Sequence, residues 1–167
     1  MRTALDADPA TFDEYKASFV AEVRKSGWFQ TCVFGDESGP AFSYTTGFWL
    51  KFNRPEVITF SLHPDVAQDA FSNMYRDLEN GREFPVGAPV DKILRKLPAV
   101  LLPVPEWRFK DYLGGSRWFY GGDKFQCLQL AWPDRKGKFP WQVGFSSKLL
   151  KDQPDLTAAN WSGLREH

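Results

Sequence analysis

The sequence predicts an α+β fold, in which two to three helices pack on a mainly antiparallel, curved sheet, and closure of that sheet into a partial barrel is one option. Two observations carry this prediction. Apolar residues recur at helical spacing over residues 9–26 and 65–80. Around these segments the chain changes to short runs rich in β-branched and aromatic residues, and turn sequences separate the runs.

The length and charge of the chain limit its class. Its 167 residues are 43% hydrophobic, which suits a single domain over 1–167 with a core at about 9–145 and an irregular C-terminal tail over 146–167. Lys plus Arg and Asp plus Glu each total 21, so no overall field favours nucleic acid or an anionic membrane. No stretch has the length of a membrane span and the N-terminus lacks a signal peptide, so we expect a soluble, cytoplasmic protein.

The first predicted helix occupies residues 9–26. Thr11 and Glu14 have the spacing of a capping box at its start, and Gly27 is a typical residue for its end. The apolar face of this helix carries Phe12, Tyr15, Phe19 and Val23. This face should pack on the sheet.

Three strands follow the first helix. The runs at 28–34 and 41–48 flank a turn-rich sequence and are expected to form a hairpin. A loop over 49–55 then leads to an alternating, β-branched third strand at 56–62.

His63 and Pro64 open the second predicted helix, over 65–80, and Gly81 ends it. Its buried stripe should contain Val66, Ala70, Phe71, Met74 and Leu78. The five prolines between residues 82 and 105 then exclude a long helix or a central strand. Short edge strands are expected there, around 92–96 and 99–104.

The last third of the core contains one further helix, one strand and one turn. Residues 106–122 are read as the helix, with Gly114 and Gly115 at a close packing contact. The strand is expected at 125–132. A carboxylate that follows Trp-Pro can accept backbone N–H groups, so Asp134 should cap a turn, and Gly137 should let residues 138–141 return antiparallel to the strand.

Catalytic and metal-binding groups are scarce in the sequence. The two cysteines, Cys32 and Cys127, lie in strand-like segments and are expected to be reduced and buried. The only histidines are His63 and His167, so no metal site is predicted. The nucleophile-elbow, P-loop and dinucleotide-binding motifs are absent. We therefore assign no catalytic residues and expect binding rather than catalysis.

Two segments are candidates for binding a ligand or a partner. The first contains Tyr44, Thr45, Thr46 and Trp49, because a strand that ends in hydroxyls and Gly47 can present donors to a phosphate or an oxyanion. Threonines also simply favour strands, so these residues have a structural interpretation too.

The second segment contains Trp132, Asp134, Arg135 and Trp141. Its basic and aromatic residues together could bind single-stranded nucleic acid, but the zero net charge argues against this. An Asp-capped turn with buried aromatics is the structural alternative.

Four motifs give the chain a resemblance to a known family. They are Gly-Trp at 27–28, GPAFSYTTGFW at 39–49, RPEVITFSLHPDVA at 54–67, and a late Gln-x-x-Trp-Pro-Asp at 129–134. In this order they resemble the bacterial family catalogued as domain of unknown function 4262, over about residues 15–154. The resemblance implies no activity, and the Trp-Pro-Asp signature brings no catalytic role with it.

Two functions remain open at this stage. The 16% aromatic content favours a binding or interaction protein, such as an immunity-type or regulatory partner of another protein, with an exposed patch of tryptophans and charges at 132–141. The alternative is a small-molecule binder or oxidoreductase with Tyr44–Trp49 and the Trp-Pro-Asp turn as pocket walls. The 42–49 hairpin, the next strand and the helix are similar to the opening of flavin-reductase-like split barrels, which would imply FMN. No cofactor is expected otherwise.

Overall fold

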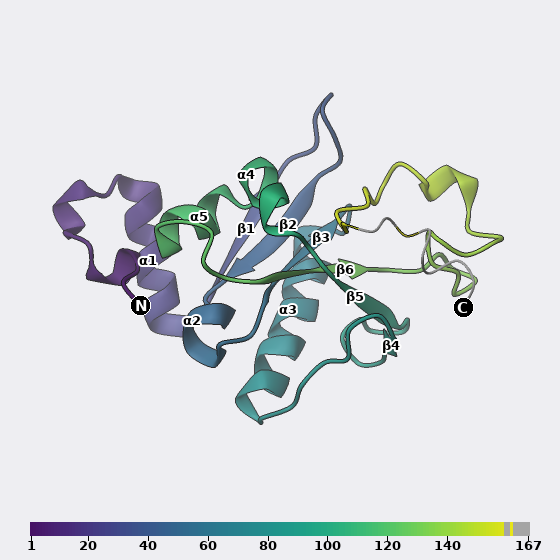
Figure 1. Cartoon of the computed structure of the whole chain (residues 1–167), viewed down its shortest axis with the longest axis horizontal. Helices are drawn as coiled ribbons and strands as arrows, with labels where there is room; N and C mark the ends of the chain where they lie inside the picture. The colour runs from purple at the N-terminus through teal and green to yellow at the C-terminus, as the bar shows by residue number, and fades with distance from the viewer. Residues whose placement is uncertain (159–160, 162–167) are drawn as a thin grey trace.

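The computed structural model describes residues 1–158 and 161 (Figure 1). It confirms the α+β fold. The strands are β1 Phe29–Val33, β2 Phe42–Thr46, β3 Glu56–Phe60, β4 Pro89–Val90, β5 Ala99–Pro103 and β6 Cys127–Ala131. The α-helices are α1 Glu14–Ser26, α2 Phe48–Phe52, α3 Pro64–Glu79, α4 Phe109–Tyr112 and α5 Gly114–Tyr120. Short 3₁₀ turns lie at Ala4–Asp6, Pro9–Thr11, Glu106–Arg108 and Ser147–Leu149.

The six strands form one open sheet in the order β1-β2-β3-β6-β5-β4. Four of the five pairings are antiparallel, whereas β3 and β6 run parallel, with Glu56 opposite Cys127. The expected partial barrel does not form, because β1 and the two-residue β4 remain at opposite ends of the sheet. The parallel pair joins strands that are distant in sequence, and the chain between them includes α3.

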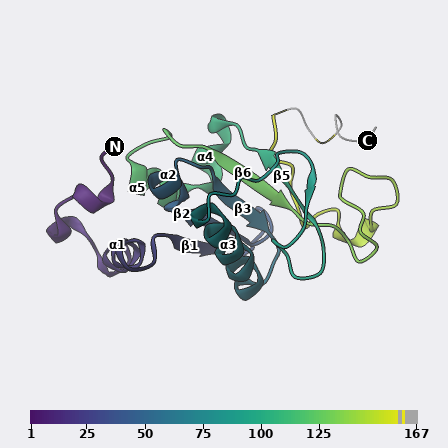
Figure 2. The ribbon, with the colours of Figure 1, turned by 90° about the horizontal axis from the view of Figure 1, so that it is seen from below.

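Each face of the sheet has its own cover. Val57 and Ile58 are adjacent in β3 and belong to different core clusters, since successive strand residues point to opposite faces. Helix α3 packs against the Val57 face, and α1, α4 and α5 pack against the Ile58 face. Figure 2 shows α3 and α4 on opposite sides of the sheet. The buried residues of α3 are Ala67, Ala70, Phe71, Met74 and Leu78.

The segment after β6 covers part of the Ile58 face of the sheet, at the end of the molecule opposite α1 (Figure 1). Phe139 and Trp141 cover Val100 and Ala131 there. Residues 138–141 form no return strand, which corrects that prediction. Their aromatic side chains join the core cluster of β5 and β6 residues instead of extending the backbone ladder. Residues 146–158 contain the 3₁₀ turn Ser147–Leu149 and otherwise no regular element.

Helix α1 starts later than predicted. Asp13, rather than a Thr11–Glu14 box, caps it by accepting a hydrogen bond from Lys16 N at 2.8 Å. The Thr11 hydroxyl donates to Asp8 O within a separate 3₁₀ turn. Phe19 and Val23 are buried as expected, but Tyr15 is 56% exposed.

Three further differences concern the first three strands and α3. The predicted loop at 49–55 contains the helical turn α2, which begins directly after Gly47. Val66 was expected in the buried stripe of α3 but is 46% exposed. Cys32 is also exposed, whereas Cys127 is buried, and both are free thiols.

The proline-rich middle contains one inner strand and no strand at 92–96. β5 lies between β6 and β4, so it is not an edge strand. Residues 91–97 form a series of bends, and Ile93 and Leu94 are buried against α3. The predicted helix at 106–122 is divided by Leu113 into α4 and α5.

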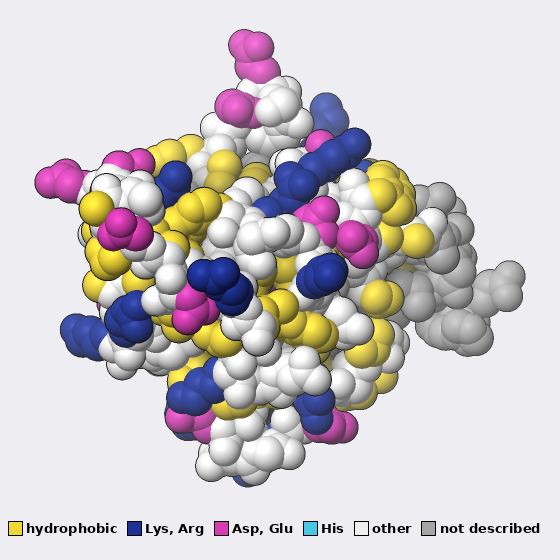
Figure 3. Space-filling view, turned by 60° about the vertical axis from the view of Figure 1, so that its left-hand side comes forward, with side chains coloured by type: hydrophobic (Ala, Val, Ile, Leu, Met, Phe, Trp, Pro, Cys, Tyr) yellow, Lys and Arg dark blue, Asp and Glu magenta, His cyan; other side chains and the backbone are white. Residues whose placement is uncertain are grey.

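Neither basic nor acidic side chains dominate the face of the protein shown in Figure 3. Figure 3 shows Lys and Arg interspersed with Asp and Glu on the face that it presents. Within the described residues, no helix combines the length and the apolar character that a bilayer span requires.

Candidate functional site

The predicted hydroxyl segment in β2 lies inside the protein. Tyr44, Thr45 and Thr46 are at most 2% exposed. The Tyr44 hydroxyl accepts a hydrogen bond from Gly115 N at 2.8 Å, and the Thr46 hydroxyl is 2.7 Å from the Ser116 hydroxyl. These groups therefore join β2 to α5, which is a structural role for the hydroxyls that the sequence analysis selected.

A buried carboxylate that the sequence analysis did not select lies beside this segment. Glu56, the first residue of β3, is fully buried. It accepts hydrogen bonds from Thr45 Oγ1 at 2.8 Å and from the backbone N–H groups of Gly47, Phe48 and Trp49 at 3.0–3.1 Å. The Tyr120 hydroxyl also donates to it. The Pro-Glu pair at the start of the third strand was the available sequence signal.

Glu56 and Tyr120 together hold the start of α2. The Tyr120 oxygen accepts hydrogen bonds from Gly47 N and Leu50 N while its hydroxyl proton goes to Glu56. Burial raises the pKa of Glu56, and burial together with the nearby Glu56 raises the pKa of Tyr120. Every polar contact of this pair is internal, so the cluster fixes the turn from β2 into α2. Trp49 is half-buried on α2 and packs against the core.

Asp134 is a turn cap, as predicted. Its side chain accepts backbone hydrogen bonds from Lys136 and Lys138 at 2.9 Å and from Ser146 at 3.0 Å. Hydrogen bonding by the backbone of Lys138 is the main cause that lowers the pKa of Asp134. The carboxylate thus ties the turn to the chain twelve residues later.

The predicted exposed patch of tryptophans at this turn does not form. Trp141 is only 7% exposed and stacks on Phe139 with their ring centroids 5.1 Å apart. Trp132 is half-buried, and Gln153 binds both its backbone N–H and its carbonyl at 2.9 Å. Arg135 is exposed. The aromatic rings turn inward because they cover apolar residues of β5 and β6.

Trp132 and Pro133 instead line a groove on the α3 side of the sheet. The groove encloses about 580 Å³. Its floor and walls are apolar side chains of α3, of the segment 91–97, and of the ends of β3 and β6: Leu62, Val66, Ala70, Ile93, Leu94, Leu97, Trp132 and Pro133. We call this cavity the α3 groove.

The α3 groove lies at the carboxyl ends of the parallel strands β3 and β6. The indole N–H of Trp132, just after β6, donates to the carbonyl of Phe60, the last residue of β3, at 2.8 Å. Leu62 follows β3 and also lines the groove. In open sheets, ligands commonly bind outside the carboxyl ends of parallel strands, so this is a favourable location for a binding site.

Polar side chains surround the groove. Asn73 donates to Ile93 O at 3.1 Å and accepts from Arg76 Nη2 at 2.8 Å. Arg95 and Lys96 are exposed on the opposite wall, and Asp69 lies on α3. Asn73 therefore connects α3 to the segment 91–97 and holds Arg76 beside the groove.

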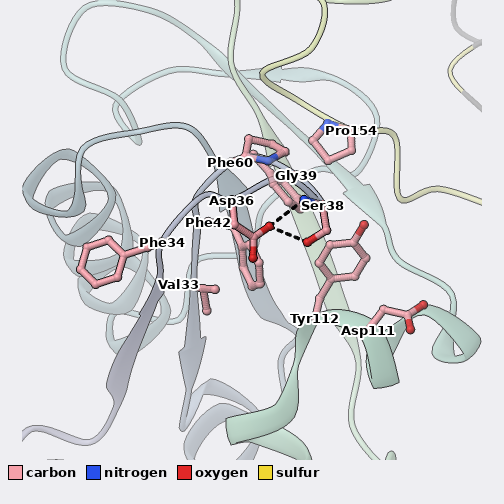
Figure 4. Close-up of a pocket in the computed structure, with 11 residues that line it drawn as sticks. Val33, Phe34, Asp36, Ser38, Gly39, Phe42, Phe60, Asp111, Tyr112 and Pro154 are labelled. Carbon is pink, nitrogen blue, oxygen red and sulfur yellow. Dashed lines mark hydrogen bonds between the residues drawn. The ribbon is translucent and has the colours of Figure 1, made fainter.

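A second hollow, of about 380 Å³, lies between the β1–β2 hairpin, Tyr112 and Pro154. Figure 4 shows that the Asp36 carboxylate is turned to Ser38, which donates two hydrogen bonds to it, and that the Phe34 ring points away from the other lining residues. Its one hydrogen-bonded carboxylate already stabilises the hairpin turn, as the turn sequence predicts. Unlike the α3 groove, this hollow has no basic side chain among the described residues of its lining that could bind an anionic ligand.

Neither the groove nor the rest of the described residues contains a cluster of potential metal ligands. Among the residues that the structure places, no three His, Cys, Asp or Glu side chains gather closely enough to bind an ion. His63 accepts a hydrogen bond from Asp65 N at the start of α3, and His167 lies outside the described residues.

Comparison with known families identifies the group to which the protein is related. The model of the Domain of unknown function (DUF4262) matches residues 22–146, well over half of the chain. The chain belongs to this family. The DUF4262 match includes all six strands and α3, and therefore the whole lining of the α3 groove. Searches of curated proteins and of solved structures found no significant match.

Proposed function

We propose that this DUF4262 protein binds a small molecule and that the α3 groove is its binding site. The observation that carries the proposal is the position of Trp132 and Pro133. These residues belong to the Trp-Pro-Asp signature through which the sequence resembles its family, and they form one wall of the groove. Asp134, the third signature residue, fixes the turn that follows.

The size and chemistry of the groove support this proposal. Its volume of about 580 Å³ falls within the range of about 300–1,000 Å³ that is typical of small-molecule sites. Its walls are mainly apolar, with a few polar side chains near the rim. The polar side chains of the lining are Asp69, Ser72, Asn73, Arg76, Arg95 and Lys96, and such groups can orient a bound molecule by hydrogen bonds and ion pairs.

The burial of Trp141 weakens the alternative of a partner protein docked on the 132–141 turn. An interface of that kind usually centres on exposed aromatic anchors, and Trp141 is buried under its own neighbours. An FMN site that combines Tyr44 with the Trp-Pro-Asp turn also has less support, because Tyr44 is enclosed between β2 and α5.

The test is an NMR screen of the ¹⁵N-labelled protein against a small-molecule fragment library that includes FMN and free nucleotides. Binding in the groove should shift amide signals in residues 62–76, 91–97 and 132–133. Val66→Trp should fill the groove and abolish these shifts, since Val66 lines it and is partly exposed. Val143→Trp makes the same change at a side chain that is 94% exposed and outside the lining, so binding should persist there.

Two outcomes would overturn the proposal. One is a set of fragment-induced shifts confined to another part of the chain, such as the hairpin hollow of Figure 4. The other is equal binding by the wild type and by a folded Val66→Trp variant. Unchanged amide dispersion in both tryptophan variants would establish that they are folded.

A further inference from the structure

The α3 groove has a local charge that differs from that of the whole protein. The net charge of the chain is zero. The titratable side chains that line the groove are three basic residues, Arg76, Arg95 and Lys96, and one acidic residue, Asp69. The groove thus has an excess of positive charge beside apolar walls.

The three basic residues have no carboxylate partner among the described residues. Lys51, Arg54, Arg82 and Arg117, in contrast, form ion pairs with acidic side chains. Arg76 is instead held by Asn73, and Asn73 is held by the carbonyl of Ile93. Among residues 1–158 and 161, the Arg76 side chain forms a hydrogen bond through Nη2 alone, so its guanidinium keeps donors available beside the groove.

The apolar and the basic parts of the groove are arranged along α3. Val66 is the third residue of α3 and Arg76 lies ten residues later, which corresponds to about 15 Å along the axis. The strand ends that supply Leu62, Trp132 and Pro133 meet the groove near the start of α3. The Asn73–Ile93 contact marks where the segment 91–97 crosses toward Arg76.

We infer that the ligand of the α3 groove is a small organic anion with an apolar body. This inference rests on the proposed function and specifies its ligand class. The apolar body packs against Trp132, Pro133 and Val66. The anionic group lies toward Arg76, whose planar guanidinium suits a carboxylate. Arg95 and Lys96 add positive potential from the opposite wall.

Three matched probes test the charge of the ligand: 2-naphthoate, the neutral 2-naphthamide and the cationic 2-naphthylmethylamine. They share one aromatic body, so differences in affinity report the charged group. NMR titrations of the full chain should give 2-naphthoate the highest affinity, about fivefold above the amide, which is the upper range for a solvent-exposed ion pair. This advantage should shrink in high salt, because salt screens exposed charges.

Matched variants locate the effect. Arg76→Gln should remove most of the preference for 2-naphthoate, and the double substitution Arg95→Gln with Lys96→Gln should remove a smaller part of it. Both should leave 2-naphthamide binding unchanged. Arg135→Gln removes the same charge from the nearby turn, but Arg135 does not line the groove, so the preference should be retained. Loss of the preference in Arg135→Gln alone would overturn the assignment.

The outcomes separate this inference from the proposed function. If the acid and the amide bind the groove equally, or the amine binds best, the anion assignment is wrong and the groove remains a binding site. If none of the probes, and no fragment of the library, shifts amides of the groove, the proposed function itself is wrong. If 2-naphthoate binds more tightly than the amide and this difference depends on Arg76, the result supports both the proposed function and the anion assignment.

Discussion

Trp132 and Phe60 link the ends of the two parallel strands through a hydrogen bond of 2.8 Å from the indole N–H to the backbone carbonyl. The bond joins residues that are 72 positions apart in sequence. It fixes the Trp132 ring at the carboxyl end of the β3–β6 pair, where the ring becomes a wall of the α3 groove.

Trp132→Phe should therefore lower both stability and ligand affinity. Phenylalanine keeps most of the apolar area but removes the donor to Phe60 O, which should cost about 1 kcal/mol of unfolding free energy. Urea denaturation measures this loss. Trp107→Phe is the control, because Trp107 is 60% exposed and should tolerate the change. Equal stability of the two variants would contradict a structural role for the bond.

The adjacent glycines of α5 should respond oppositely to alanine. A Cβ on Gly115 would lie 2.9 Å from the Tyr44 hydroxyl and 3.2 Å from Phe19, so Gly115→Ala should destabilise the protein by about 1–3 kcal/mol. A Cβ on Gly114 would meet no atom within 4 Å, so Gly114→Ala should be neutral or stabilising by up to about 1 kcal/mol. Chemical denaturation of both variants checks the contrast. A stabilising Gly115→Ala would show that α5 can move away from the sheet.

Glu56→Gln should destabilise the fold strongly, although the two side chains have nearly the same shape. Each carboxylate oxygen accepts at least one backbone N–H bond, from Phe48 on one side and from Gly47 and Trp49 on the other. Whichever oxygen the amide group replaces, a buried N–H loses its acceptor, at a cost of about 1–3 kcal/mol per group.

Denaturation with Glu37→Gln as the control measures the effect of Glu56→Gln. Glu37 is exposed in the β1–β2 turn, so its substitution should leave stability nearly unchanged. A Glu56→Gln variant as stable as this control would refute the role of Glu56 in holding α2.

Asp134→Asn should destabilise the protein in a manner that depends on pH. The folded pKa of Asp134 lies below its ordinary value of 3.8, so the carboxylate contributes stability above that value and loses it as the pH falls through the lower folded pKa. The melting temperature of the variant should be below that of the wild type at neutral pH, and the difference should diminish in acid. Asp111→Asn, at an exposed position, should show no such pattern. A constant difference across the pH range would exclude the ionised cap.

The elements that sequence reasoning located correctly are those with a strong local signal. Helix α3 and the strands β1, β2, β3 and β6 follow from periodicity and composition, and Asp134 was identified as a cap from its position after Trp-Pro. Family membership was also predicted from ordered motifs and is confirmed over residues 22–146.

The elements that it missed depend on distant partners. Helix α2 is only five residues long, and Glu56 and Tyr120 stabilise its start from other parts of the chain. The bends at 91–97 look like a strand in sequence, but Ile93 and Leu94 are buried by packing on α3. Tyr44, Thr45 and Thr46 look like available donors until α5 covers them.

The sequence by itself determined the α+β class, the main helices and strands, the Asp134 turn and the family. These depend on local backbone preferences and on apolar spacing within a few residues. Only the tertiary structure decided that β3 and β6 run parallel, that Trp141 turns inward, and that Trp132 and Pro133 meet α3 and the segment 91–97 in one groove. Those features arise because side chains far apart in sequence pack together on the two faces of the sheet. Local backbone preferences and apolar spacing do not determine which distant side chains meet.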